Sequence, residues 1–308
     1  MELKLIAGSS SVELAEEIAK HTGVNLIKRT IKKFKDGETY VKIEESIRGD
    51  DVFVIQSTAN PVNENFMELF IMLDALKRAS AGRITVVIPY YGYARQDRKA
   101  EAREPITAKL VADMLTVAGA NRILACDLHV PQLQGFFNIP VDEISAISLF
   151  GKYFMEKNIK NPVVVAPDTG AVKRARSLAK IMHCPIAIID KRRTAHNEAQ
   201  VVNIVGNVKG KTVIILDDII DTGNSILHSA EALSKDASEV YICATHAVFS
   251  GDCPVRLMNS DIKEIIVTNT IQTRCSSEKI KVISIARLLS EVIQNINTNT
   301  SVSVLFNQ

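Results

Sequence analysis

Strand-like and helix-like segments alternate along the chain, and this alternation restricts its possible folds more than any other feature. Short apolar runs fit strands and longer amphipathic stretches fit helices at residues 2–7, 12–21, 52–56, 64–79, 84–88 and 105–118. Repeated strand–helix–strand units predict parallel sheets with helices on both faces. Because 308 residues exceed the size at which one core usually stops growing, we expect two doubly wound α/β domains.

The two halves of the chain show a weak internal sequence similarity. A strand with Cys126 three residues before His129 resembles a strand with Cys243 three residues before His246. We therefore expect two domains related by duplication, at residues 1–145 and 146–290. The last helix, at residues 285–296, has an apolar stripe, and the tail at 291–308 is expected to join the first domain. The helix at residues 64–79 is expected to have Asn63 as its cap.

Charge and cysteine content exclude several classes of protein. The formal net charge is only +2, from 37 basic and 35 acidic residues, so no nucleic-acid partner is expected. No segment has the length of a membrane span, and residues 1–11 do not resemble a signal peptide. The five cysteines form no Cys-x-x-Cys pair. We expect a soluble protein in the reducing cytoplasm, without a membrane partner.

The segment at residues 212–225 indicates a phosphate site. A buried strand at 213–216 is followed by acidic residues and then by small residues that open a helix. The carboxyl end of a parallel strand is where ligands bind in open α/β sheets, and a helix N-terminus favours an anion. The expected sugar-phosphate site comprises Asp217, Asp218, Asp221, Thr222, Gly223, Asn224 and Ser225.

The acids in this segment need a different ligand from the phosphate. Asp217 and Asp218 would repel a phosphate, but they suit the diol of a ribose, either directly or through a divalent cation. The alternative is an ordinary helix cap with two surface acids. Neither a Walker A sequence nor a Gly-x-Gly-x-x-Gly after a strand is present, so any ATP site must be built differently.

Several motifs together resemble a known family. The segment at 212–225 is similar to the phosphoribosyl-pyrophosphate motif of type I phosphoribosyltransferases. The further segments lie at residues 34–38, 89–98, 127–129, 134–137 and 190–193. With them, nearly the whole chain resembles ribose-phosphate pyrophosphokinase. The resemblance implies an enzyme that transfers the pyrophosphoryl group of ATP to ribose 5-phosphate and releases AMP.

The resemblance assigns cationic residues to this transfer. Lys191 and Arg193 match the catalytic pair of the family, and Arg95 and Gln96 match positions that contact ATP. Positioning and charge neutralisation dominate phosphoryl transfer, so cations are the expected machinery. Taken without the resemblance, the first pair would be a strand-end charge cluster and the second an exposed charged loop.

The resemblance also implies an adenine loop and an oligomer. Phe34, Asp36 and Glu38 match the adenine-binding positions, although the sequence alone equally fits a hairpin turn at 36–37. In the family this loop reaches a neighbouring subunit, so a homo-oligomer is implied, a hexamer by resemblance. Phosphate and ADP are the implied regulators, and the candidate regulatory positions are Ser46, Arg48, Ser303 and Phe306.

Magnesium is the implied cofactor, and His129 and Asp168 match its positions. Because Mg²⁺ prefers oxygen ligands, His129 is expected to be a weak or orienting partner. Without the resemblance, a single His after a strand would be interpreted as structural.

The phosphate segment departs from the family at two positions. Asn224 stands where glycine is usual, and Ser225 stands where threonine is usual. The serine keeps a hydroxyl. Because asparagine tolerates the left-handed conformation, we expect the loop to accommodate Asn224.

Three other functions are compatible with parts of the pattern. A non-catalytic regulatory paralogue would be expected to lose the cationic segment, the lysine or the acidic loop, and all of these are present. A phosphoribosyltransferase that consumes the product would explain residues 212–225 but not residues 34–38 or the region of Lys191. A pure sugar-phosphate-binding module would need none of the cations.

Overall fold

The computed structural model describes residues 1–192, 201–273, 275 and 277–302, and it divides the chain into two compact units. The first unit comprises Met1–Ser145, Thr270–Gln272 and the C-terminal segment from Ser284. The second comprises Ala146–Asn269 and Thr273–Ile283. Each unit is described by itself below.

The first unit is built on a parallel sheet whose strands follow one another in chain order. Within the described residues this sheet contains β1 (Leu3–Ala7), β4 (Asp51–Ile55), β5 (Arg83–Ile88), β6 (Arg122–Cys126) and β7 (Val141–Ile144). All five side chains of β4 are buried, as expected for a strand covered on both faces. The near-continuous apolar runs in the sequence have this origin.

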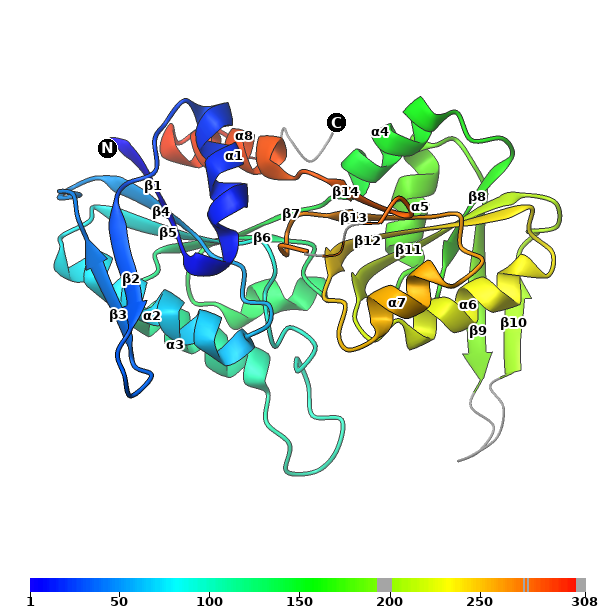
Figure 1. Cartoon of the computed structure of the whole chain (residues 1–308), viewed down its shortest axis with the longest axis horizontal. Coiled ribbons are helices and arrows are strands. Elements are labelled where there is room, and N and C mark those ends of the chain that lie inside the picture. The colour runs from blue at the N-terminus through cyan, green and yellow to red at the C-terminus, as the bar shows by residue number, and fades with distance from the viewer. Residues whose placement is uncertain (193–200, 274, 276, 303–308) are drawn as a thin grey trace. The chain divides into compact units, whose positions relative to one another are not determined.

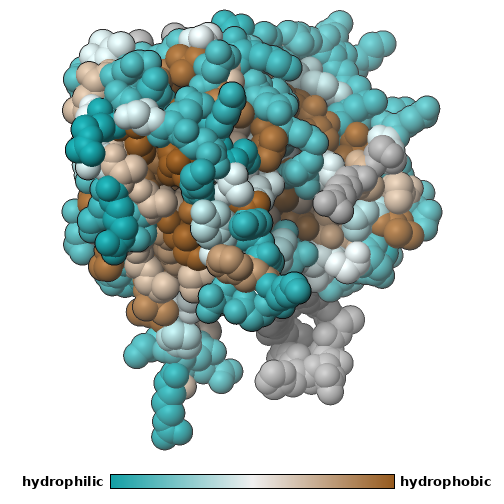
Figure 2. Space-filling model, turned by 60° about the vertical axis from the view of Figure 1, so that its left-hand side comes forward, coloured by the Kyte–Doolittle hydropathy of each residue, from teal (hydrophilic) through white to brown (hydrophobic). Residues whose placement is uncertain are grey.

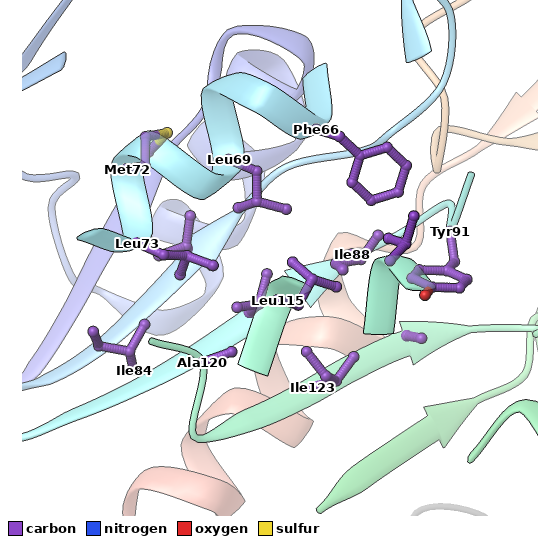
Figure 3. Packing of buried hydrophobic residues seen from close by; sticks show 14 of the residues in the cluster. Phe66, Leu69, Met72, Leu73, Ile84, Ile88, Tyr91, Leu115, Ala120 and Ile123 are labelled. Carbon is purple, nitrogen blue, oxygen red and sulfur yellow. The ribbon is translucent and has the colours of Figure 1, made fainter. Parts of the chain in front are cut away.

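Helices cover both faces of this sheet (Figure 1). Helices α1 (Val12–Thr22) and α8 (Ala286–Asn297) lie on one face, and α2 (Val62–Arg78) and α3 (Thr107–Ala118) lie on the other. The short helices η1 (Ser9–Ser11) and η2 (Pro131–Phe136) follow β1 and β6. Figure 3 shows the core between the second helix pair and the sheet, where Phe66 and Leu69 from α2 and Leu115 from α3 pack over Ile88 and Ile123.

A buried carboxylate ties the end of α8 to the first sheet. Asp51 is fully buried, and it accepts hydrogen bonds from Arg83 Nε at 2.8 Å and Nη2 at 2.5 Å and from Asn297 Nδ2 at 2.9 Å. Arg83 Nη2 also donates to the carbonyl oxygen of Ile296 at 2.9 Å. The arginine thus satisfies both the acid and the C-terminal end of the helix.

A two-stranded antiparallel hairpin projects from the first unit. It consists of β2 (Arg29–Lys33) and β3 (Thr39–Ile43). At its tip, the amide of Phe34 donates to the carbonyl of Glu38 at 2.8 Å, and Gly37 adopts a φ of 95°. The hairpin interpretation of residues 36–37 is therefore confirmed.

The second unit contains a doubly wound sheet. Its strand order is β10, β9, β8, β11, β12, β13, β14 in the described part of the chain, and only β10 is antiparallel to its neighbour. The strands are β8 (Pro162–Ala166), β9 (Ile186–Arg192), β10 (Val201–Val205), β11 (Thr212–Ile220), β12 (Glu239–Ala247), β13 (Glu264–Thr268) and β14 (Ile280–Ile283). The chain starts at β8, builds outward to β9 and β10, and then returns to the other side of β8 at β11. Such a reversal creates a crevice at the carboxyl ends of β8 and β11, where α/β proteins bind ligands.

The helices of the second unit also cover both faces of its sheet (Figure 1). Helices α4 (Ile147–Lys157) and α5 (Val172–Ile181) lie on one face, and α6 (Asn224–Ser234) and α7 (Cys253–Met258) lie on the other. Buried residues of α6 and α7, such as Leu233 and Leu257, join one core with Ile215 of β11.

The predicted fold class, α/β with two parallel-sheet domains, is confirmed. The duplication stays a prediction, since the strand order reverses in the second sheet but runs in chain order in the first.

The expected cap of α2 is wrong in detail. The helix begins at Val62 with Pro61 at the N-cap, so Asn63 lies inside the first turn. Its side chain instead accepts a hydrogen bond from the Tyr93 hydroxyl.

The surface mixes hydrophilic and hydrophobic residues (Figure 2). Across residues 1–192, 201–273, 275 and 277–302, no helix combines the length and apolar character needed to cross a bilayer. Exposed apolar side chains recur at helical spacing along α3 and the residue before it, at Ile106, Leu110, Met114 and Val117. This stripe is the outward face of a helix whose inner face packs in the core.

Candidate active site

The acidic pair lies within β11 and not in a loop after it. The strand was expected to end near residue 216, but it continues to Ile220 because pairing with β12 extends to Ile219 and Ile220. Consecutive strand residues point to opposite faces, so Asp217 and Asp218 have different surroundings. Asp218 is buried and accepts a hydrogen bond from Arg174 Nη2 of α5 at 2.8 Å. The same nitrogen lies 3.9 Å from Asp217 Oδ1.

Two neighbouring carboxylates, the buried one of Asp218 and the half-buried one of Asp217, disfavour each other's charged form. Desolvation raises the pKa of the Asp217 carboxyl well above its ordinary range, and the carboxylate of Asp218 raises it further. A cation or the hydroxyl groups of a sugar placed beside Asp217 would favour its charged form. The carboxylate at the end of β11 therefore suits a ligand that donates hydrogen bonds or carries positive charge.

Residues 221–225, here called the phosphate-type loop, follow β11 directly. Asp221 comes after β11, Gly223 adopts a φ of 78° as the N-cap residue, and α6 begins at Asn224. Thr222, Asn224 and Ser225 are exposed. Their backbone amides lie at the positive end of α6, where an anion is stabilised.

Asn224 is accommodated for a different reason from the one expected. Asn224 is not among the residues with positive φ, because Gly223 takes the left-handed conformation. Asn224 occupies the first position of α6, where an asparagine backbone is unstrained. Its side-chain oxygen accepts a hydrogen bond from Arg256 Nη1 at 2.7 Å.

Asp168 lies at the same edge of the second sheet. It follows β8, which pairs in parallel with β11 up to Val165 and Ile215, so Asp168 and the acids of β11 come two or three residues after this pair. Asp168 is exposed, and its Oδ1 accepts a hydrogen bond from the amide of Ala171 at 3.0 Å. Lys191 lies on β9, the other neighbour of β8, opposite Val202 of β10. Arg193 is outside the described residues.

The remaining predicted residues belong to the first unit. Arg95 and Gln96 are exposed in the loop after β5, and the Thr107 hydroxyl at the start of α3 donates to Gln96 Oε1 at 2.5 Å. Both residues line a pocket of about 520 Å³ that also includes Asn63 and Tyr93. His129, which is half-buried, follows the neighbouring strand β6.

The hairpin tip carries the three expected adenine-binding residues. Phe34 is 48% exposed, and its ring packs edge-on against Tyr40 with centroids 5.6 Å apart. The amide of Glu38 donates to Asp36 Oδ1 at 3.1 Å, which shapes the turn. An exposed aromatic face beside two carboxylates is suited to a purine.

Sequence reasoning missed two arginines that contact the predicted site. Arg174 belongs to a basic cluster at residues 173–176 that could equally have been a solvated face. Arg256 stands alone in the sequence and carried no signal. Its position becomes apparent only when α7 folds beside the phosphate-type loop.

The donor set fits magnesium only in combination with a substrate. Among the described residues, no three His, Cys, Asp or Glu side chains are grouped as a complete cation site. Magnesium commonly binds through one or two carboxylates together with water and substrate phosphates. Asp168 is exposed and meets this requirement, whereas the imidazole of His129 is a poor ligand for a hard cation.

A doubly wound sheet with carboxylates and a phosphate-type loop at its strand reversal is the arrangement typical of α/β proteins that bind phosphate esters. The family described as the N-terminal domain of ribose phosphate pyrophosphokinase matches residues 3–119, and the phosphoribosyl synthetase-associated domain matches residues 192–307.

Individual relatives agree along the whole chain. The chain is 54% identical to ribose-phosphate pyrophosphokinases from Fusobacterium nucleatum and from Bacillus subtilis, over 99% of its length and 98% and 97% of theirs. It is 44% identical to the phosphoribosylpyrophosphate synthetase from Mycobacterium smegmatis, whose crystal structure matches with a TM-score of 0.91 over 97% of this chain and 100% of that one. The chain belongs to the ribose-phosphate pyrophosphokinase family of enzymes.

Proposed function

We propose that this chain transfers the pyrophosphoryl group of MgATP to the C1 hydroxyl of ribose 5-phosphate, giving phosphoribosyl pyrophosphate and AMP. The observation that carries the proposal is the joining of acids and a phosphate-type loop at the strand reversal of the second sheet. The 5-phosphate binds the amides and hydroxyls of Thr222 to Ser225, and Asp217 and Asp221 face the sugar. Asp218 supports this acidic end of β11 while it is held by Arg174.

The nucleotide is bound by residues of the first unit. Phe34 stacks on the adenine, and Asp36 and Glu38 accept hydrogen bonds from its amino group. Arg95 binds the phosphates, because a guanidinium forms forked hydrogen bonds with phosphate oxygens. Gln96 adds a polar contact, and its position is fixed by Thr107.

Cations then assist the transfer itself. Lys191 and Arg193 neutralise the charge that develops on the bridging and leaving oxygens as the sugar hydroxyl attacks the β-phosphorus. The protein supplies position and charge and forms no covalent intermediate. Bound magnesium would supply further neutralisation of the ATP phosphates, and Asp168 and His129, the latter as an orienting residue, are the positions proposed for it in their respective units.

We also propose a homo-oligomer, with a hexamer as the expected assembly. The apolar stripe formed by Ile106 and by Leu110, Met114 and Val117 of α3 supports an interface, because these four large apolar side chains are exposed at helical spacing. Phosphate and ADP are the proposed regulators. Of the candidate positions, Ser46 and Arg48 are exposed, and Arg48 donates to the Ser80 hydroxyl at 3.3 Å, whereas Ser303 and Phe306 are outside the described residues.

The proposed compartment is the cytoplasm. Cys126, Cys184, Cys243, Cys253 and Cys275 are all free thiols, which suits a reducing environment.

A single assay tests the proposal against its alternatives. Purified protein with Mg²⁺, ATP and ribose 5-phosphate should form AMP, and omission of the sugar should stop it. A regulatory paralogue would give no turnover. A phosphoribosyltransferase would instead consume phosphoribosyl pyrophosphate together with a nitrogenous base.

A further inference from the structure

Helix α7 packs beside the phosphate-type loop of the second unit and contacts it with two side chains. Cys253, the first residue of α7, is buried against Gly223, where a β-carbon would lie 2.9 Å from its sulfur. Arg256, one turn later, reaches the two residues that flank Gly223. The helix therefore supports the loop on both sides of its left-handed residue.

Arg256 holds the loop with a single nitrogen. Its Nη1 donates to Asn224 Oδ1 at 2.7 Å and to the carbonyl oxygen of Thr222 at 3.3 Å. The acceptors are a side chain on the helical side of Gly223 and a backbone group on the strand side. Hydrogen bonds from a charged donor are stronger than neutral ones. This contact fixes the spacing between Thr222 and Asn224.

The loop needs such a constraint because it is otherwise exposed. Thr222, Asn224 and Ser225 are exposed to solvent, so packing restricts them little. Ordering exposed residues when a ligand binds carries an entropic penalty, and a loop held in its bound conformation avoids part of it. A glycine at position 224 would offer Arg256 no side-chain acceptor.

We propose that Arg256 is a positioning residue for the 5-phosphate of ribose 5-phosphate, and that it acts through the side chain of Asn224. The inference rests on the proposed function of the loop. Arg256 preorganises the amides of the loop, and its positive charge adds to the positive end of α6. Asn224, which stands where the family usually has glycine, thereby becomes part of the proposed phosphate site.

The experiment combines two substitutions with a matched control. Arg256→Ala should raise the KM for ribose 5-phosphate about tenfold or more, in line with the loss of a charged hydrogen bond, while the KM for ATP and the Tm change little. Arg256→Lys should recover part of the affinity. The control is Arg287→Ala, which removes an exposed arginine paired with Glu291 on α8 and should leave both KM values unchanged.

Coupling to Asn224 provides the test that a general structural role would fail. In an Asn224→Gly background, Arg256→Ala should raise the KM for ribose 5-phosphate by a clearly smaller factor. An unchanged KM in Arg256→Ala would overturn the proposal. Equal factors in both backgrounds, or a parallel rise in the KM for ATP with a lower Tm, would also overturn it.

Direct binding separates this inference from the function on which it rests. Titration calorimetry with ribose 5-phosphate, and with ribose as the comparison lacking phosphate, measures affinity without turnover. If the wild-type protein forms no AMP, the proposed function fails. If it forms AMP and Arg256→Ala binds ribose 5-phosphate as tightly as wild type, only the role of Arg256 fails.

Discussion

Arg174 and Asp218 form an ion pair at the carboxyl end of β11, with Nη2 and Oδ1 2.8 Å apart. The side chain of Asp218 is only 4% exposed, and that of Arg174 is 23% exposed. The pair joins α5 to the strand that carries the acidic end of the site. It therefore links the stability of the second unit to the geometry of the proposed sugar-phosphate site.

Removal of the Arg174 guanidinium should destabilise the protein. Arg174→Met leaves the carboxylate of Asp218 buried without this partner, and loss of one member of a buried pair lowers the free energy of unfolding by about 3 kcal/mol. Chemical denaturation of the variant measures the loss. The neighbouring exposed residue provides the control, since Lys173→Met should change stability little. Equal stability of the two variants would contradict the importance of the pair.

Asp217 should make the ligand-free protein less stable as pH rises. Because its pKa is raised in the folded state, its favourable contribution is complete below the unfolded pKa and is lost as pH rises through the folded pKa. Asp217→Asn should therefore raise the Tm at neutral pH, have little effect in acid, and weaken binding of ribose 5-phosphate. Melting curves from acid to neutral pH measure the difference in Tm between Asp217→Asn and the wild type. Asp236→Asn, at an exposed position, is the control. A pH-independent difference would show that burial of this carboxyl is not responsible.

Gly223→Ala should impair the phosphate-type loop more than strain alone predicts. The left-handed conformation costs a non-glycine residue about 1–2 kcal/mol, and the new β-carbon would also lie 2.9 Å from Cys253 Sγ. Gly210 has a similar φ of 67° with open space around it, so Gly210→Ala isolates the strain. Unfolding measurements should show a larger loss for Gly223→Ala, together with a higher KM for ribose 5-phosphate. Matching losses would exclude the contact with Cys253.

The buried carboxylate beneath α8 should be essential to the first unit. Asp51→Ala leaves Arg83 without its main partner and should lower the free energy of unfolding by about 3–5 kcal/mol. The matched control is Asp74→Ala, which breaks an exposed aspartate–arginine pair with Arg78 on α2. Denaturation curves should show almost no change in the control. A small effect at Asp51 would mean that α8 is held by apolar packing alone.

Lys191→Ala should lower turnover by roughly 10³-fold or more, on the scale of a transition-state cation in phosphoryl transfer. The position of Lys191 on β9, next to β8, which precedes Asp168, supports this role. Lys180→Ala, which removes an exposed lysine on α5, should retain activity. Single-turnover measurements separate the chemical step from substrate binding. Near-normal turnover would remove Lys191 from the mechanism.

Local patterns predicted most of the fold because they report local physics. The apolar runs marked β1, β4 and β5 nearly to the residue, and helical periodicity located α1, α3 and α8. The length of β11 could not be predicted in this way. Its last residues carry two acids that are unfavourable in a buried strand, and pairing with β12 and the ion pair to Arg174 override that preference.

Local sequence chemistry alone indicated a candidate site only where its residues are adjacent in sequence. Residues 217–225 form one segment, so their chemistry was visible before the fold was known. Arg256 lies more than thirty positions after Asn224 and contacts it only because α7 packs beside α6. The role that asparagine plays at position 224 likewise depends on Gly223 taking the left-handed conformation.

The central claim is transfer of an intact pyrophosphoryl group, and ³¹P nuclear magnetic resonance of the products tests it most directly. With Mg²⁺, ATP and ribose 5-phosphate, both the β- and γ-phosphorus of ATP should appear on C1 of the sugar, with one AMP for each phosphoribosyl pyrophosphate. Formation of ADP with a single phosphoryl group on the sugar would contradict the account, as would the absence of any turnover.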